Sequence, residues 1–271
     1  MNSSERERAA QAASAAGDGL FVRALERGLA VIRAFDGSPP ELSLSEVAGR
    51  AGMSPAAARR YLHTFVELGY LAQHGRTFVA QPKLVELAFP YYATAAFTRP
   101  VEAELERLAT EVGESCALTV RNGAFVTNVV CANAHRELAI QIQVGRQLPA
   151  YCSAMGRILL AALPADEVRE VLESAERVRH TAHTVTDLAE LIGIIERART
   201  CGYAVGDEEF QVGIRSVAVG VRNASGEVVG AVSISAAAAR VPTSTLTAEL
   251  LSKLRSTAER VEVHLATGSV R

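Results

Sequence analysis

The strongest constraint on the fold is a pair of helices joined by a tight turn, encoded by the stretch SLSEVAGRAGMSPAAARRYLHTFVELG. In the first helix, Ser43 is an N-cap and Glu46, three residues later, completes a capping box. Gly52 ends that helix, Ser54 caps the second, and Pro55 occupies its first turn, where a missing N–H costs little. This spacing predicts a helix-turn-helix.

The segments on either side extend this motif. Residues 20–35 have apolar side chains at helical spacing, with arginine and glutamate between them. Residues 70–82 contain two short strands around a turn at His74-Gly75. The order of helix, short helix, turn, helix and two-stranded hairpin predicts a winged helix-turn-helix domain over residues 20–82.

The outward face of the helix that begins at Pro55 is small and basic. The opposite face carries the apolar stripe Ala58, Tyr61, Leu62, Phe65 and Leu68. A recognition helix enters the major groove by its first turns, where an alanine methyl can meet a thymine methyl and arginine can pair with guanine or phosphate. The candidate DNA-binding residues are Ser43, Ser45, Ser54, Ala56, Ala57, Arg59, Arg60, His63 and, in the wing, Arg76. A winged helix that contacts protein is the alternative.

The rest of the chain alternates strands and helices. Residues 83–99 are largely helical and are interrupted by Pro90, so they are expected to link two domains. In residues 100–271, hairpin signals occur at Asn122-Gly123 and at residues 223–226, and LAIQIQVG, residues 138–145, reads as an alternating strand. Helices are expected in SAMGRILLAAL, in DLAELIGIIERARTCG and near the C-terminus. The predicted fold class is α+β, with an antiparallel sheet in this second domain.

Composition excludes several classes of protein. Net charge is -2 for 271 residues, which does not by itself indicate a nucleic-acid binder. No apolar run is long enough to span a membrane, and residues 1–19 lack the apolar centre of a signal peptide and are expected to form a disordered tail. The four cysteines are far apart and form no C-x-x-C, as expected for reduced thiols in a cytoplasmic protein.

Motifs for catalysis and for cofactors are weak. There is no phosphate-binding loop, dinucleotide fingerprint or nucleophile elbow. His180 and His183 lack the further ligands that a metal site needs. The acidic run 207–209 reads better as a solvated turn than as an acid/base pair, and Cys152 as a buried thiol. We therefore expect no enzymatic activity, metal or cofactor.

One segment suggests a site for a small anion. Ser153, Ala154 and Gly156 lie at a strand-to-helix junction, where free N–H groups without bulky side chains favour a carboxylate. The alternative is a capped helix packed on a sheet, which the residues alone favour.

Taken together, four blocks resemble the IclR family of bacterial transcriptional regulators. They are FVRALERGLAVIRAF, LSLSEVAGRAGMSPAAARRYLHTFVELGYL, PAYCSAMGRILLAALP and GYAVGDEEFQVGIRSVAVGVRNASGEVVGAVSIS. The sequence of these blocks is most similar to the Pca and Pob type regulators of aromatic-acid catabolism through the β-ketoadipate pathway. The resemblance implies a GAF-like or PAS-like effector-binding and oligomerisation domain over residues 100–271. It also implies a homodimer or a dimer of dimers (a homotetramer) on palindromic double-stranded promoter DNA, with RNA polymerase as a further partner.

The resemblance also places an effector pocket. It implies contacts from Ser153, Ala154, Met155, Gly156, Asp207, Ser216, Ser233 and Ser235. Gly206 and Ser216 differ from the acidic residue and the cysteine common in the family, which argues against glyoxylate or pyruvate as effector. Tyr151 and Tyr203 are expected to line a pocket for a flatter aromatic acid.

The predicted function is therefore a ligand-responsive DNA-binding regulator of a catabolic operon. A small-molecule enzyme or sensor domain fused to a protein-binding winged helix is the alternative.

Overall fold

The computed structural model describes residues 20–36, 39–94, 98–136 and 139–267. It separates into two compact units, Met1–Tyr91 and Tyr92–Arg271, which divide within helix α5 (Val85–Thr94). The predicted tail, residues 1–19, lies outside the described residues. The predicted boundaries at residues 82 and 99 stay predictions.

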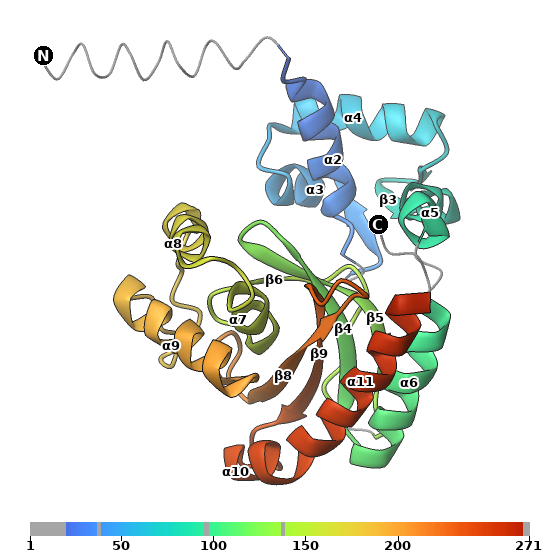
Figure 1. The fold of residues 1–271 in the computed structure, drawn as a ribbon. Helices are drawn as coiled ribbons and strands as arrows, with labels where there is room; N and C mark the ends of the chain where they lie inside the picture. The colour runs from blue at the N-terminus through green and yellow to red at the C-terminus, as the bar shows by residue number, and fades with distance from the viewer. Residues whose placement is uncertain (1–19, 37–38, 95–97, 137–138, 268–271) are drawn as a thin grey trace, which may run out of the picture. The chain divides into compact units, whose positions relative to one another are not determined.

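The first unit is a small helical domain with a three-stranded sheet (Figure 1). Its elements are α2 (Arg23–Arg33), β1 (Glu41–Ser43), α3 (Leu44–Arg50), α4 (Pro55–Glu67), β2 (Leu71–His74) and β3 (Thr77–Ala80). The strands are antiparallel in the order β1-β3-β2. The core consists of Val31, Ala34, Leu42, Val47, Leu62, Leu71 and Phe78. Strand β1 was not predicted, because three residues are too few to show an alternating pattern.

The predicted helix caps are confirmed. Ser43 Oγ accepts a hydrogen bond from the Glu46 backbone N–H at 3.3 Å, and the Glu46 carboxylate accepts one from the Ser43 N–H at 2.7 Å. Ser54 Oγ accepts from the Ala57 N–H at 3.3 Å, and Pro55 is the first residue of α4. Gly52 and Gly69 adopt positive φ just beyond the two helices, a conformation that glycine tolerates best. Local chemistry thus determines where both helices begin and end.

A short 3₁₀ turn, η1 (Pro82–Leu84), leads into α5, which has Pro90 inside it. The first helix that lies wholly in the second unit is α6 (Thr98–Val112). No helix in the described residues is long and apolar enough to cross a membrane.

The second unit is built on one six-stranded sheet. The strands are β4 (Ser115–Asn122), β5 (Phe125–Ala132), β6 (Gln147–Pro149), β7 (Ala204–Asp207), β8 (Ile214–Arg222) and β9 (Val228–Ala237). Their order is β6-β5-β4-β9-β8-β7, and every neighbouring pair is antiparallel. The hairpins predicted at Asn122-Gly123 and at residues 223–226 join β4 to β5 and β8 to β9.

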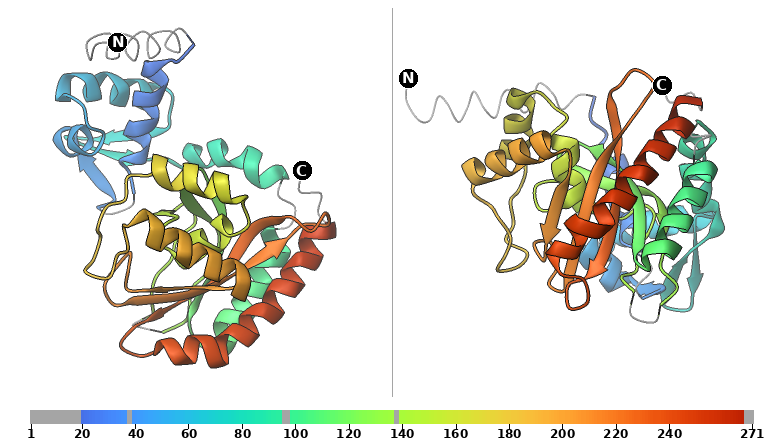
Figure 2. Two further views of the ribbon diagram at one scale, coloured as in Figure 1. Left: turned by 60° about the vertical axis from the view of Figure 1, so that its left-hand side comes forward. Right: turned by 60° about the horizontal axis from the view of Figure 1, so that its bottom comes forward.

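Helices cover both faces of this sheet (Figures 1 and 2). The helices are α7 (Ala154–Leu160), α8 (Ala165–Ser174), α9 (Leu188–Cys201), α10 (Thr243–Thr245), the π-helical turn η2 (Leu246–Leu250) and α11 (Leu251–Thr267). Helices α6 and α11 share one core with the sheet, and α7, α8 and α9 share a second core with it. Strand alternation explains the division, since Val232 and Ile234 face the first core while Ala231 faces the second.

The strand predicted for residues 138–145 is wrong over its described part. Residues 139–143 have no regular structure, and the next strand is β6. The side-chain amide of Asn133 takes the place of a strand neighbour: its oxygen accepts from the Ile142 N–H at 2.8 Å, and its nitrogen donates to the Ile142 carbonyl at 3.0 Å. Ile140 and Ile142, which produced the alternating pattern, line a cavity instead.

Candidate functional site

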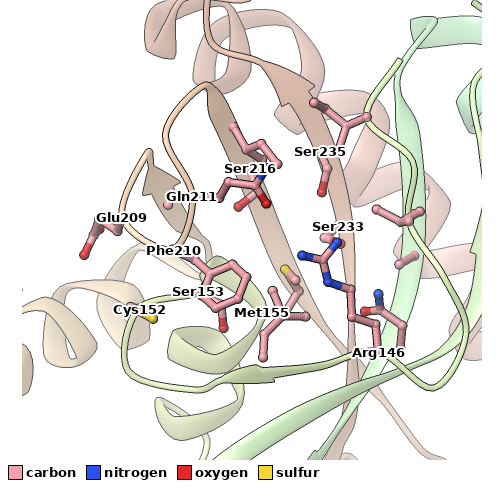
Figure 3. A pocket seen from close by; sticks show the side chains of 17 residues that line it. Arg146, Cys152, Ser153, Met155, Glu209, Phe210, Gln211, Ser216, Ser233 and Ser235 are labelled. Carbon is pink, nitrogen blue, oxygen red and sulfur yellow. The ribbon is translucent and has the colours of Figure 1, made fainter. Parts of the chain in front are cut away.

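A cavity opens on the face of the sheet that α7 covers (Figure 3). It leaves about 60 Å³ for the centres of water-sized spheres, which is enough for more than one water molecule. Most of its wall is apolar. The lining residues are Ala117, Asn128, Ile140, Ile142, Arg146, Leu148, Cys152, Ser153, Met155, Gly206, Glu209, Phe210, Gln211, Ile214, Ser216, Ser233 and Ser235.

Strand β9 contributes two serines to the wall because its residues alternate. Ser233 and Ser235 project from the face opposite to Val232 and Ile234. Ser233 is fully buried, and its Oγ is the one buried side-chain N or O atom in the described residues without a hydrogen-bond partner. A buried hydroxyl left unpaired costs about 1–3 kcal/mol. Ser233 is therefore suited to bind a polar group that enters the cavity.

Arg146 brings a positive charge to the same cavity. Its guanidinium carbon lies 5.9 Å from the centre of the Phe210 ring, and the side chain is half-buried. Within the described part of the chain, Arg146 has no carboxylate partner. Figure 3 shows its side chain reaching into the hollow toward the side from which Phe210 enters. An arginine in a largely apolar pocket favours a carboxylate, which it can hold with two hydrogen bonds.

The start of α7 is occupied by its own cap. Ser153 Oγ accepts from the Gly156 N–H at 3.2 Å and donates to the Pro149 carbonyl at 2.9 Å. A Cβ on Gly156 would lie 2.2 Å from the Ala150 carbonyl oxygen, so glycine is required for packing at this position. The capped-helix interpretation therefore accounts for both residues, although Ser153 also lines the cavity.

The structure brings together half of the predicted effector-binding residues. Those that line the cavity are Ser153, Met155, Ser216, Ser233 and Ser235. Those outside its lining are Tyr151, Ala154, Gly156, Tyr203 and Asp207.

Two of the residues outside the lining are aromatic. Tyr151 is buried, which raises the pKa of its hydroxyl above the usual range, and the hydroxyl donates to the Val178 carbonyl at 2.5 Å. The Tyr203 ring packs beneath the guanidinium of Arg255, at 5.8 Å. Neither ring is placed to stack on a molecule in the cavity.

The three carboxylates of the acidic run 207–209 are all engaged. Asp207 pairs with Arg215 and accepts from Thr243. Glu208 also pairs with Arg215, at 3.5 Å, and accepts from the Gly213 N–H at 2.8 Å. Glu209 forms a buried ion pair with Arg157. These contacts do not form an acid/base pair.

Cys152 also lines the cavity. Burial raises the pKa of its thiol to about 12, so the group is a neutral thiol at physiological pH.

Sequence reasoning missed the residues that give the cavity its charge and its aromatic wall. Arg146 follows a glycine in an irregular segment, and Phe210 follows the acidic run. Neither belongs to a periodic pattern, so no local signal separates them from other arginines and phenylalanines.

In the first unit, a groove lies between α3, α4 and the wing. Five of the nine predicted DNA-binding residues line it: Ser43, Ser45, Arg59, His63 and Arg76. The other four, outside this lining, are Ser54, Ala56, Ala57 and Arg60. The hydroxyls of Ser43 and Ser54 are engaged in helix caps. Arg59, Arg60 and Arg76 are exposed and have no carboxylate partner among the described residues.

Both units match known protein families. A model of the IclR helix-turn-helix domain matches residues 24–75, and a model of the bacterial transcriptional regulator IclR C-terminal domain matches residues 94–263. These families consist of transcriptional regulators and not of enzymes.

Individual relatives agree with this assignment. The Pca regulon regulatory protein of Pseudomonas putida is 35% identical over 231 residues, which cover 85% of this chain and 79% of that protein. The p-hydroxybenzoate hydroxylase transcriptional activator of Acinetobacter baylyi is 27% identical and covers 89% of this chain and 91% of its own length. An IclR homologue of Microbacterium hydrocarbonoxydans, crystallised with 4-hydroxybenzoate, has a TM-score of 0.73 and 25% identity. That match covers 89% of this chain and 98% of the homologue.

Proposed function

Because this chain belongs to the IclR family of bacterial transcriptional regulators, we propose that it controls an operon for the catabolism of aromatic acids in response to one such acid. The observation that carries the proposal is a largely apolar cavity with two polar groups in its wall, Arg146 and the Ser233 hydroxyl. Among the described residues, Arg146 has no carboxylate partner and the hydroxyl has no hydrogen-bond partner. One carboxylate, one flat apolar ring and one polar substituent match these three features.

In this arrangement the carboxylate of the acid pairs with Arg146. The ring packs among Phe210, Ile142 and Leu148, and a ring hydroxyl bonds to Ser233. The relatives support the same class of ligand, since one is named for p-hydroxybenzoate hydroxylase and another was crystallised with 4-hydroxybenzoate. A dicarboxylate fits less well, because Arg146 is the one arginine or lysine among the lining residues.

The DNA-binding form in this proposal is a homodimer, or a dimer of dimers, on a palindromic promoter site. One winged helix alone offers few contacts, and two copies reading two half-sites supply both affinity and symmetry. Helix α2 and the residues before it expose an apolar face, which a second copy would cover. The exposed residues are Leu20, Phe21, Val22, Leu25 and Leu29.

Acid binding would alter the relative geometry of the recognition helices and so change the affinity for DNA. Such coupling typically amounts to about 1–3 kcal/mol, and it is reciprocal, so promoter DNA must change the affinity for the acid by the same factor.

Calorimetry on the full chain tests the ligand. We expect 4-hydroxybenzoate or protocatechuate to bind, and β-ketoadipate to bind more weakly. Arg146→Gln should raise Kd about 10- to 100-fold, since a hydrogen-bonded charge contributes about 1.5–3 kcal/mol. Arg169→Gln, on the exposed side of α8, is the matched control and should leave Kd unchanged. If wild-type protein binds none of these acids, the proposed ligand class is wrong.

A further inference from the structure

The Arg157–Glu209 ion pair ties together two walls of the cavity. Arg157 lies on α7, the helix that supplies Met155 to the lining, and Glu209 lies in the connection between β7 and β8. The two guanidinium nitrogens donate to the two carboxylate oxygens, each at 2.5 Å. The side chains are 3% and 10% exposed. In Figure 3 the Glu209 carboxylate turns away from the hollow, as this contact requires.

Both partners are held by further hydrogen bonds. Arg157 Nε donates to the Tyr151 carbonyl at 3.0 Å, and Nη1 donates to the Val205 carbonyl at 3.2 Å. The backbone carbonyl of Glu209 accepts from the Thr184 hydroxyl at 2.6 Å. Glu209 is thus fixed through its side chain and through its main chain.

The residue before Glu209 is in a strained conformation. Glu208 has φ 56° and is the one non-glycine residue with positive φ among the described residues. Such backbone persists where its surroundings over-determine it. Here the Glu208 N–H donates to the Ile214 carbonyl at 2.9 Å, and its own carbonyl accepts from Thr181 at 2.8 Å.

The residue after Glu209 is Phe210, the aromatic ring of the cavity wall. Its ring lies 5.1 Å from the His180 ring and 5.9 Å from the Arg146 guanidinium, measured from ring centre. The ring also packs against the core that α7, α8 and α9 share with the sheet, and its angle in the wall depends on the backbone that carries it. That backbone is set by Glu208 and Glu209.

A buried ion pair is a weak way to stabilise a fold, because apolar side chains of similar volume often do as well or better. Its directional, two-pronged geometry is better suited to fixing the position of a segment. We propose that Arg157 and Glu209 are positioning residues for the effector cavity. They hold Phe210 at the angle at which its ring and Arg146 together receive an aromatic carboxylate. This inference rests on the proposed function for the ligand, while the placement of Phe210 can be measured without any ligand.

The central variant is the double change Arg157→Met with Glu209→Met, which removes the pair and leaves no buried charge unpaired. It should unfold within a few degrees of wild type. In calorimetry its Kd for 4-hydroxybenzoate should rise 10-fold or more. Phe210→Ala should raise Kd by a similar factor, and adding it to the double variant should bring no further loss, because both changes remove the same contact. Additive losses in the triple variant would overturn the proposal.

The matched control is a second bidentate pair in this unit, Arg240–Glu114, which lies outside the cavity lining. Arg240→Met with Glu114→Met should leave the Kd for 4-hydroxybenzoate within 2-fold of wild type. An equal loss in this control would mean that removing any bidentate pair from this unit disturbs the cavity, which would contradict a specific role for Arg157 and Glu209.

A ligand-free readout completes the test. With 4-fluorophenylalanine at position 210, wild type should give one fluorine resonance displaced from that of the free amino acid. The Arg157→Met/Glu209→Met variant should move it toward the free position, and the Arg240→Met/Glu114→Met control should not. Arg157→Lys keeps the positive charge but cannot donate two parallel hydrogen bonds to Glu209, so it provides a milder change if the double variant does not fold. An unmoved resonance overturns the proposal. If wild type does not bind 4-hydroxybenzoate, the proposed ligand fails while the fluorine signal still decides the placement of Phe210.

Discussion

The two units of this chain use arginine in different ways. In the winged-helix unit, Arg59, Arg60 and Arg76 are exposed and have no carboxylate partner among the described residues. In the effector-binding unit, several arginines bind carboxylates at close range. The pairs are Arg157–Glu209, Arg215–Asp207, Arg240–Glu114 and Arg260–Glu104.

The difference reflects how far each arginine is exposed to solvent. An exposed guanidinium stays hydrated and remains available to a phosphate, whereas a buried one must be paired because an isolated buried charge is very costly. Arg146 and Arg177 are both half-buried without a carboxylate partner in the described residues, but Arg177 donates to the backbone carbonyls of Leu172 and Thr186. Among the described residues Arg146 has only the Phe210 ring beside its guanidinium, which makes it the exception. That exception marks the cavity as a place where an anion from outside completes the pairing.

Breaking a buried pair should have the largest effect. The Arg157 side chain is 3% exposed and donates both guanidinium nitrogens to Glu209. Glu209→Gln should lower the free energy of unfolding by about 3–5 kcal/mol, because it leaves the buried charge of Arg157 without its partner. Urea denaturation measures the change. Arg76→Ala, in the other unit, should change the stability by less than about 0.5 kcal/mol. Similar losses in both variants would remove the distinction between the units.

Removing an unpaired arginine should instead weaken DNA binding and leave stability intact. We expect Arg60→Ala to weaken specific promoter binding by about 1–3 kcal/mol, the cost of losing one side chain that reads a base. Arg59 lies in the groove with Arg76, so Arg59→Ala should lower affinity for all sequences and reduce the salt slope by about 1, as for a phosphate contact. Gel shifts at several salt concentrations, on promoter and unrelated DNA, separate the two roles.

Arg33→Ala, in the last turn of α2 and outside the groove, is the control for these measurements. Normal promoter affinity and an unchanged footprint in Arg60→Ala would contradict its role at the DNA surface. A relaxed sequence preference in Arg59→Ala would instead assign base reading to that residue.

The winged-helix unit was largely readable from the sequence because its signals are local. Each helix start is specified by residues at most three positions apart, so no tertiary information is needed. The capping box of Ser43 and Glu46 starts α3, and the Ser54 cap with Pro55 starts α4. Exposed cations on α4 could be recognised from helical periodicity alone. Which arginine faces the groove required the placement of the wing, which the sequence does not contain.

The cavity was readable only in part. The family resemblance implied Ser233 and Ser235, and both line the cavity, since alternation along β9 puts them on one face. Arg157 and Glu209 are 52 residues apart, so their contact depends on the sheet order. Tyr151 was expected to line the pocket, but in the fold its hydroxyl donates a hydrogen bond to the Val178 carbonyl. These positions are set by contacts between residues far apart in the sequence, and local residue patterns do not predict such contacts.

The smallest expected effect concerns a paired arginine near the surface, between α11 and α6. Burial alone would raise the pKa of Glu104, but hydrogen bonds from Arg260 at 2.6 Å and Arg107 at 2.8 Å outweigh it and lower the pKa below 4.5. A carboxylate with a lowered folded pKa stabilises the protein above its unfolded pKa and loses that contribution as pH falls through the folded value. Arg260→Met should therefore cost up to about 1 kcal/mol at pH 7, as surface pairs do, and progressively less below pH 4.5.

Urea denaturation of wild type and Arg260→Met at pH 7, 5, 4 and 3 measures this convergence. Arg169→Met removes an exposed pair with Glu173, 3.7 Å apart on α8, and should show only a small difference at every pH. If the Arg260→Met deficit stayed constant down to pH 3, its cause would be the lost hydrogen bonds from Arg260 to Ser256 and Thr257 and not the charge of Glu104. Arg260 would then stabilise this unit by holding neighbouring residues in place and not by its charge. The positioning role inferred for Arg157 would in that case extend to half-exposed arginines.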